Sequence, residues 1–319
     1  MKQIGKKIIT LIITLFVVSF VTFFLFDRIP SNPALAMLGT NVTEERLAEL
    51  EEQMGLNDPF FNRYGNFLKG LFEKEGNVSY TYQVPASELI QERLPITFTL
   101  MAFSFLITLA ISIPFGMLAG RKKHSKTGGI ITVFSQLIMS IPPFFLGILL
   151  TILFGLVLNW IQVGNYVSYE ENKVSFFTYM ILPAISVSIP KIAMVIKFLR
   201  VSMLEQMKQN YVITAKGKGL NSVRILTVHV LKNALIPVLT IMGMIVGDLL
   251  AGSIVVEQVF NIPGLGRLLV TSIGNRDYPV VSTIIVFIAS VVMIAYGLID
   301  ILYIMADPRM RREETIERN

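Results

Sequence analysis

Six long apolar runs alternate with segments that hold most of the charged residues of this 319-residue chain. A helix that crosses a bilayer needs about 20 consecutive, mainly apolar residues, and each run reaches that length. The runs cover residues 8–26, 95–120, 130–161, 176–203, 234–260 and 278–305. The pattern therefore predicts an all-α integral membrane protein with six transmembrane helices.

Ionisable residues are scarce inside these runs. They are Lys191, Lys197, Arg200, Asp248, Glu257 and Asp300. A charge in the hydrocarbon region is costly, so each of them needs a partner, water or the membrane interface. A self-contained proton- or sodium-coupled carrier would normally show a relay of such residues, and this scarcity argues against that class.

The composition agrees with a membrane protein. Hydrophobic residues make up 53% of the chain and charged residues 16%, with a mean hydropathy of +0.63, whereas soluble domains average about 45–50% and about 25%. This balance excludes a soluble enzyme, a secreted scaffold and a DNA-binding protein, despite the formal net charge of +6. The chain has no cysteine and only two histidines, His124 and His229, which excludes disulfides, zinc–thiolate sites and a His-rich metal site.

Lysine and arginine gather in alternate connecting segments, which the positive-inside rule assigns to the cytoplasm. These residues are Lys2, Lys6, Lys7, Arg121, Lys122, Lys123, Lys126, Lys208, Lys216, Lys218, Arg224, Lys232, Arg309, Arg311, Arg312 and Arg318. The long connection 30–94 is instead acidic. Both termini are therefore predicted to be cytoplasmic and the acidic loop extracytoplasmic.

The first apolar run has two interpretations. A cleaved signal peptide would have an apolar core of about 7–15 residues, and Ala34-Leu35-Ala36 offers a formal cleavage site. The run 8–26 is longer than that, and Asp27 and Arg28 separate it from the site. An uncleaved signal anchor is the better interpretation.

The acidic loop contains one clear helix signal. Thr43 is a good N-cap, Glu44 and Glu45 suit the first turn, and Gly55 suits the end of the helix. Two interpretations of this loop stay open: it forms short helices that pack on the bundle, or it is only a solvated connector. The predicted organisation is an anchor at 1–29, an extracytoplasmic loop at 30–94, a five-helix core at 95–305 that includes a cytoplasmic segment at 204–233, and a cytoplasmic tail at 306–319.

No enzymatic motif is present in the sequence. The chain lacks G-x-x-x-x-G-K-[ST], H-E-x-x-H and G-x-S-x-G, so it has neither a phosphate loop nor a familiar hydrolase centre. It is expected to be non-catalytic, to bind no cofactor or metal of its own, and to take its energy from another chain.

The cytoplasmic segment 210–220 is the most informative stretch. It reads as part of two short amphipathic helices that meet near Gly219, with Tyr211, Ala215 and Leu220 forming a small apolar knob. Ala215 and Gly219 lie four residues apart and would permit close approach of another protein surface. The alternative is a basic segment that only satisfies the positive-inside rule and touches phospholipid.

This segment resembles the cytoplasmic loop of permease subunits in binding-protein-dependent ABC importers, which carry an E-A-A, three residues, G motif. Ala215 and Gly219 match the last Ala and the Gly, whereas Ile213 and Thr214 replace the Glu and the first Ala. The match is better with the peptide/nickel subfamily pattern D-Y-V-x-T-A-x-A-K-G-L followed by R-N-A-L-x-P.

The narrower resemblance continues along nearly the whole chain. It includes the stretches 28–30, 54–59, 92–97, 140–144, 255–260, 263–266, 276–279 and 307–309. In this order they resemble the first of the two permeases in oligopeptide, dipeptide and nickel importers. Proline in Ser140-Ile141-Pro142-Pro143 should also bend the third run, and 263–266 reads as a re-entrant turn on the extracytoplasmic side.

The resemblance implies a set of partners: a second homologous permease, two ABC ATPases that hold ATP and Mg²⁺, an extracytoplasmic peptide-binding protein and the lipid bilayer, without nucleic acid. It also implies an ATPase-coupling role for one group of residues. That group is Tyr211, Ala215, Lys216, Lys218, Gly219 and Leu220.

Asp248 and Glu257 are the candidates for the substrate path. Asp248 would face a wet cavity, where a substrate amine could bind it, or would pair with the partner permease, and Glu257 is either structural or part of a gate. Asp300 and Lys191 are expected to pair within the bundle or reach the interface.

The predicted function is import of oligopeptides or dipeptides as a permease of the plasma membrane of a bacterial or archaeal cell. Nickel or a metal–metallophore complex is the alternative cargo. A self-contained secondary carrier and a receptor or scaffold that senses peptides are the alternatives outside the class.

Overall fold

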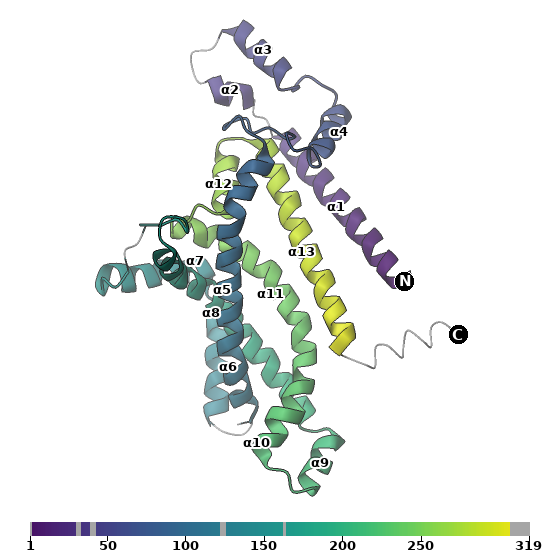
Figure 1. Cartoon of the computed structure of the whole chain (residues 1–319), viewed down its shortest axis with the longest axis vertical. Coiled ribbons are helices and arrows are strands. Elements are labelled where there is room, and N and C mark those ends of the chain that lie inside the picture. The colour runs from purple at the N-terminus through teal and green to yellow at the C-terminus, as the bar shows by residue number, and fades with distance from the viewer. Residues whose placement is uncertain (1, 30–32, 39–42, 122–125, 162–163, 307–319) are drawn as a thin grey trace. The chain divides into compact units, whose positions relative to one another are not determined.

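The computed structural model describes residues 2–29, 33–38, 43–121, 126–161 and 164–306 (Figure 1). The helices are α1 (Lys2–Arg28), α2 (Pro33–Leu38), α3 (Glu44–Gln53), α4 (Phe60–Gly70), α5 (Ala86–Arg121), α6 (Lys126–Met139), α7 (Pro143–Leu150), α8 (Lys173–Gln206), α9 (Asn210–Gly217), α10 (Ser222–Arg224), α11 (Leu231–Val259), α12 (Leu265–Gly274) and α13 (Tyr278–Ala306), with π-helical segments η1 (Thr151–Val157) and η2 (Ile225–Val230). Within these ranges the only extended pairing is a single bridge between Val78 and Pro85. The predicted all-α class is confirmed.

Five of the described helices are long and apolar enough to cross a membrane, and the number is six if one bent pair counts as a span. The bent pair is Gly128–Met139 followed by Pro143–Val157, with an angle of 97° between the two parts. It occupies the third apolar run, so the bend predicted from its prolines is confirmed. Asp300 lies on α13, but its side chain is outside the described part.

The chain forms two compact units. The first unit comprises Met1–Thr97 and Pro263–Met293, and the second unit comprises Phe98–Ile262 and Ile294–Asn319. Contacts thus group the N-terminal third with α12 and most of α13, a grouping that does not follow the linear order of the predicted domains.

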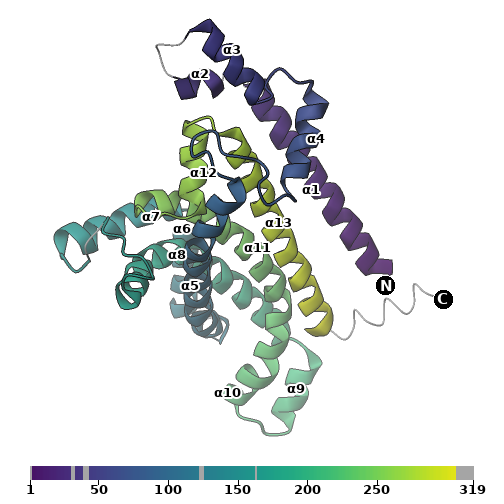
Figure 2. The same ribbon diagram turned by 45° about the horizontal axis from the view of Figure 1, so that its top comes forward.

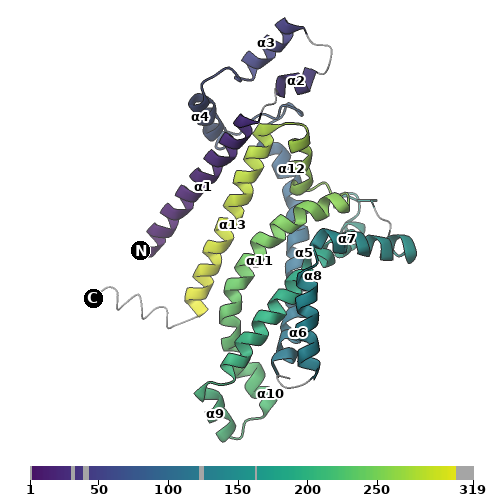
Figure 3. The same ribbon diagram turned by 180° about the vertical axis from the view of Figure 1, so that it is seen from behind.

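An aromatic cluster holds α4 against α1 in the first unit, where Figures 1 and 3 show the two helices side by side. Phe60, Tyr64 and Phe67 recur at helical spacing and therefore share one face of α4. Tyr64 and Phe67 are buried. The ring of Phe67 stacks on Phe23 at 5.4 Å between centroids, and the Tyr64 hydroxyl is 2.9 Å from Ser19 Oγ.

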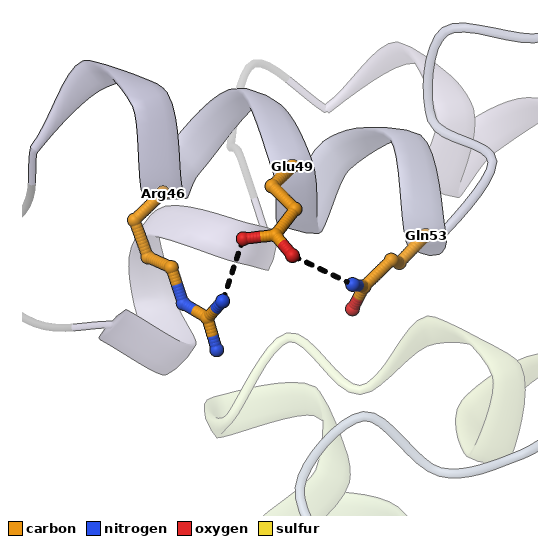
Figure 4. A network of polar contacts seen from close by, with 3 residues as sticks. All are labelled: Arg46, Glu49 and Gln53. Carbon is orange, nitrogen blue, oxygen red and sulfur yellow. Dashed lines mark hydrogen bonds and ion pairs between the residues drawn. The ribbon is translucent and has the colours of Figure 1, made fainter.

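Helix α3 begins and ends where the loop sequence predicts. Thr43 is the N-cap residue with extended backbone, although its side chain makes no capping hydrogen bond. Gly55 follows the helix at φ +63°, a conformation that glycine adopts without strain. On the exposed face, Glu49 accepts hydrogen bonds from Arg46 at 2.6 Å and Gln53 at 3.4 Å (Figure 4). Such an exposed pair adds little stability.

Helix α8 lies at the centre of the second unit and packs against α6, α7 and α11 (Figure 2). Ser188 Oγ donates to the Ser104 carbonyl at 3.0 Å, and Ser202 Oγ donates to the Ala234 carbonyl at 2.9 Å. Hydroxyls that bond to backbone carbonyls across helices satisfy their polarity where no water is available. A Cβ on Gly116 would lie 2.7 Å from Leu199 Cδ2, so α5 approaches α8 closely because this residue is glycine.

Candidate functional site

The segment 210–220, which the sequence predicts to be cytoplasmic, is part of a helical hairpin. Helix α9 ends at Gly217, Lys218 is its C-cap, and Gly219 turns the chain at φ +73°. The Asn221 side chain then accepts a hydrogen bond of 3.0 Å from the Val223 amide and caps the next helix. That helix is not the short second one that was predicted, because residues Ser222–Val259 form one continuous helix that is long and apolar enough to cross a membrane.

Tyr211, Ala215 and Leu220 do not together form the exposed apolar knob that the sequence suggested. Ala215 is only 8% exposed and Val212 2%, and both lie on the side of α9 that packs on η2. The small side chain of Ala215 is thus used inside the hairpin, whereas Tyr211 and Leu220 are half-buried. Tyr211 also donates from its hydroxyl to Gln206 Oε1 at 3.0 Å.

The exposed surface of the hairpin contains Lys216, Lys218 and Gly219, together with Ile213. Ile213 is 64% exposed and was not among the predicted coupling residues. Its position could have been read from the sequence, because two residues before Ala215 correspond to about 200° around a helix. The roles of all these residues stay predictions.

Asp248 on α11 pairs with Lys191 on α8. Their carboxylate Oδ2 and ammonium Nζ atoms lie 2.7 Å apart, and the side chains are 47% and 17% exposed respectively. The pairing expected for Lys191 within the bundle is present, and the partner of Asp248 belongs to the same chain. Neither helical periodicity nor spacing could identify a partner 57 positions away along the sequence.

Glu257, the other candidate for the substrate path, is completely buried. Two hydrogen bonds fix the end of α11 that carries it. The Ile262 amide donates to the Glu257 carbonyl at 2.8 Å, and the Tyr179 hydroxyl of α8 donates to the Phe260 carbonyl. This burial favours the structural alternative of the two that the sequence left open for Glu257.

Asp277 in the first unit is a polar centre that sequence reasoning noticed only as part of a motif. Its buried carboxylate accepts hydrogen bonds from the Ser79 hydroxyl, the Tyr80 amide at 3.0 Å and the Thr81 amide at 3.2 Å. Ser79 Oγ in turn accepts from the Tyr82 amide at 2.9 Å. Asp277 therefore fixes the 79–82 turn, as a capping residue fixes a helix end.

The same carboxylate affects Tyr80. Burial is the main cause that raises the pKa of Tyr80 to about 12, the negative charge of Asp277 adds to the effect, and Arg63 opposes it. Arg63 itself pairs with Asp27 at 2.5 Å, with side-chain exposures of 27% and 12%. Tyr80, Arg63 and Asp27 border a cavity of about 840 Å³ in the first unit, whose wall also includes residues of α3.

The described residues contain no cluster of three or more His, Asp or Glu side chains that could hold a metal ion. The candidate sites are thus a basic, partly apolar hairpin and one open ion pair between membrane helices.

Comparison with known families agrees with this architecture. Residues 112–312, which contain the bent pair, α8, the hairpin and α11, match the family described as binding-protein-dependent transport system inner membrane component. Residues 1–101 match the N-terminal region described for the same membrane components. The chain belongs to this family.

Relatives of this binding-protein-dependent transport family align over nearly the full chain. A putative peptide transport system permease protein of Brucella abortus is 35% identical over 96% of this chain and 98% of the relative. The oligopeptide transport system permease AppB of Bacillus subtilis is 35% identical over 92% and 94%. The dipeptide transport system permease DppB of Escherichia coli is 30% identical over 98% and 100%. The resemblance inferred from the motifs is confirmed.

Proposed function

We propose that this chain is a permease subunit of an ATP-driven, binding-protein-dependent importer and forms half of a translocation path for short peptides. The observation that carries the proposal is the alignment over at least nine-tenths of the chain with permeases named for peptide, oligopeptide and dipeptide transport. The long apolar helices supply the membrane-spanning body that such a subunit needs.

The proposed complex lies in the plasma membrane with both termini of this chain in the cytoplasm, as the lysine and arginine distribution indicates. It contains a second permease, two ATPase subunits that bind ATP and Mg²⁺, and an extracytoplasmic binding protein. This chain contributes no catalytic group. Closure of the ATPases would move the hairpin and rotate the helices as rigid bodies, a common form of interface-driven switching.

The coupling surface would be the exposed side of the hairpin. Lys216 and Lys218 offer positive charge to acidic groups of an ATPase, and the exposed Ile213 side chain offers an apolar contact. Ala215 would act indirectly, because it packs α9 against η2. Gly219 would keep the turn open, since an added Cβ meets no atom within 4 Å but would sit on a left-handed backbone.

The proposal is tested by tagging this chain, extracting the complex gently, and reconstituting it with its binding protein in proteoliposomes. Uptake of a labelled dipeptide that requires ATP hydrolysis supports the function, and ATP-independent uptake supports a secondary carrier. Uptake of Ni²⁺ or its chelate, without peptide uptake, supports the alternative cargo. Binding without any flux supports a receptor.

The coupling role is tested with Gly219→Trp, which should abolish peptide uptake while the complex assembles and hydrolyses ATP. The bulky side chain would obstruct the exposed turn and strain its backbone. Gly129→Trp is the matched control, because Gly129 is exposed and also has open space around an added Cβ. Normal uptake by the Gly219→Trp complex would refute the assignment.

A further inference from the structure

The ion pair between Lys191 and Asp248 occupies an unusual position for two charges. Lys191 lies near the middle of the 34-residue helix α8, and both helices belong to the membrane-spanning set. Nevertheless the Asp248 side chain is 47% exposed. Met244, one turn earlier, and Val255, two turns later on the same face of α11, are 47% and 45% exposed.

Lipid acyl chains cannot solvate the exposed carboxylate on this face of α11. A carboxylate near the middle of a membrane-spanning helix costs about 2.5 kcal/mol or more when it faces acyl chains, and its lysine partner leaves the Asp248 side chain 47% exposed. The face therefore borders water or protein. In a transport subunit, an open carboxylate beside an ammonium group within the membrane is a place where a charged solute can bind.

The pair is poorly placed for a purely structural role. The Ser202 hydroxyl already joins α8 to the Ala234 carbonyl of α11, and the Tyr179 hydroxyl joins α8 to the Phe260 carbonyl. These bonds lie on either side of Lys191 and Asp248 along α8 and α11, and both hydroxyl-bearing residues are buried. The helices are thus held together above and below an ion pair that is itself accessible.

We propose that Asp248 and Lys191 bind the two charged termini of a zwitterionic short peptide on its way through the membrane. Asp248 binds the peptide ammonium group and Lys191 binds the peptide carboxylate. The assignment rests on the proposed function and adds the substrate feature that is recognised, namely two free termini. An extended dipeptide spans about 7 Å, so a peptide that lies along the open face requires the two charged groups, now 2.7 Å apart, to separate to a similar distance. The flexible four-carbon stem of Lys191 allows this movement.

Charge balance explains the specificity. The resting pair is neutral, and a zwitterion that binds along it, one terminus on each side chain, converts one ion pair into two. A peptide with one blocked terminus would leave either Asp248 or Lys191 without a partner, which is costly at a partly desolvated site. A charge-assisted hydrogen bond contributes enough for each blocked terminus to weaken binding about tenfold.

The test uses the natural absence of cysteine in this chain. Met244→Cys places one thiol a turn from Asp248, and its rate of modification by a neutral maleimide is measured in the reconstituted permease–ATPase complex without binding protein. The probes are alanylalanine, its N-acetyl derivative, its C-terminal amide and the doubly blocked form. Val174→Cys, at an exposed position near the start of α8, is the control thiol.

Alanylalanine should slow modification of Met244→Cys, and each singly blocked form should need about tenfold higher concentration for the same effect. In an Asp248→Asn background, acetylation of the peptide should no longer weaken protection, whereas amidation still should. In a Lys191→Gln background, amidation should no longer weaken protection, whereas acetylation still should. The control thiol should respond to none of the peptides.

Three results would overturn the inference: equal protection by free and blocked peptides, no modification of Met244→Cys, or the same response in both charge variants. The comparison of the four peptides needs no change of the ion pair, so it holds even if a variant fails to assemble. ATP-driven uptake by the unaltered complex is measured in parallel. Loss of protection with uptake intact refutes this site alone, whereas absence of uptake refutes the proposed function.

Discussion

Two polar centres, one in each compact unit, use a carboxylate in different ways. In the first unit, Asp277 is buried with three hydrogen-bond donors around it, and Asp27 is only 12% exposed beside Arg63. In the second unit, Asp248 is 47% exposed although it lies on a membrane-spanning helix. A carboxylate surrounded by donors holds a structure together, whereas one left half open beside its partner is available to a solute.

The largest effect is expected from Asp277→Ala. The variant leaves the Ser79 hydroxyl and the Tyr80 and Thr81 amides without their acceptor, at a cost of about 3 kcal/mol or more. Hydrogen exchange of the two amides should become about 100-fold faster. Glu75→Ala, at an exposed position, should leave the exchange unchanged, and slow exchange in Asp277→Ala would show that the turn is held by other contacts.

Asp27→Asn should have the next largest effect, because it leaves the mostly enclosed Arg63 without its counter-charge. Breaking a buried pair costs about 3–5 kcal/mol, and the partial exposure of Arg63 reduces this to about 2 kcal/mol. Thermal unfolding of the purified complex measures the loss. The Arg63→Met/Asp27→Leu double variant should recover part of it, because no charge is then left alone. If the double variant loses as much stability as the Asp27→Leu and Arg63→Met single variants added together, the two residues do not interact.

Tyr80 should make the first unit sensitive to high pH. Its folded pKa lies near 12, above the ordinary value of 10, so its contribution to stability is complete below pH 10 and is lost as pH rises towards 12. The loss is about 1–2 kcal/mol after allowance for partial exposure. Tyr80→Phe should lose less stability than the parent between pH 10 and 12 in thermal unfolding. Parallel loss in both proteins would contradict the effect.

Asp248→Asn should have the smallest effect on stability. The pair opens to solvent at Asp248, and the flexible stem of Lys191 can carry its ammonium group to that opening when the carboxylate is lost. The change therefore costs only about 0–1 kcal/mol, and buried hydrogen bonds hold α8 and α11 together on both sides of the pair. Thermal unfolding should therefore barely change, although peptide preference does. A loss as large as that of Asp27→Asn would remove the contrast between the two units and make Asp248 a structural residue.

Much of the fold could be predicted because it depends on local patterns. Apolar length identifies the membrane helices, and consecutive prolines identify the bend, since a residue before proline avoids the helical conformation. Pro142 indeed has an extended backbone at ψ 141°. Pro183 and Pro190 do not interrupt their helix, and α8 continues through both. Their separation and burial let the neighbouring helices support the interrupted hydrogen bonding.

The site was less predictable because it depends on contacts between distant segments. Lys191 and Asp248 were each recognised as costly in a membrane, but their pairing requires the packing of α8 on α11. Likewise, the sequence of α9 alone does not show whether Ala215 faces solvent or the neighbouring helix. Its burial follows from the packing of α9 on η2 in the hairpin. Asp277 binds a turn nearly 200 positions away, a relation that no periodicity in the sequence records.

The bend in the third apolar run also affects the surrounding bilayer. Its two parts, Gly128–Met139 and Pro143–Val157, meet at 97°, so they cannot both run along the membrane normal. The longer part extends only about 22 Å at 1.5 Å per residue, less than the hydrocarbon thickness of about 30 Å. Neither part alone matches the bilayer, so a span built from this pair crosses it only when both parts are tilted well away from the membrane normal, and the lipid around the bend meets helix sides at an unusual inclination.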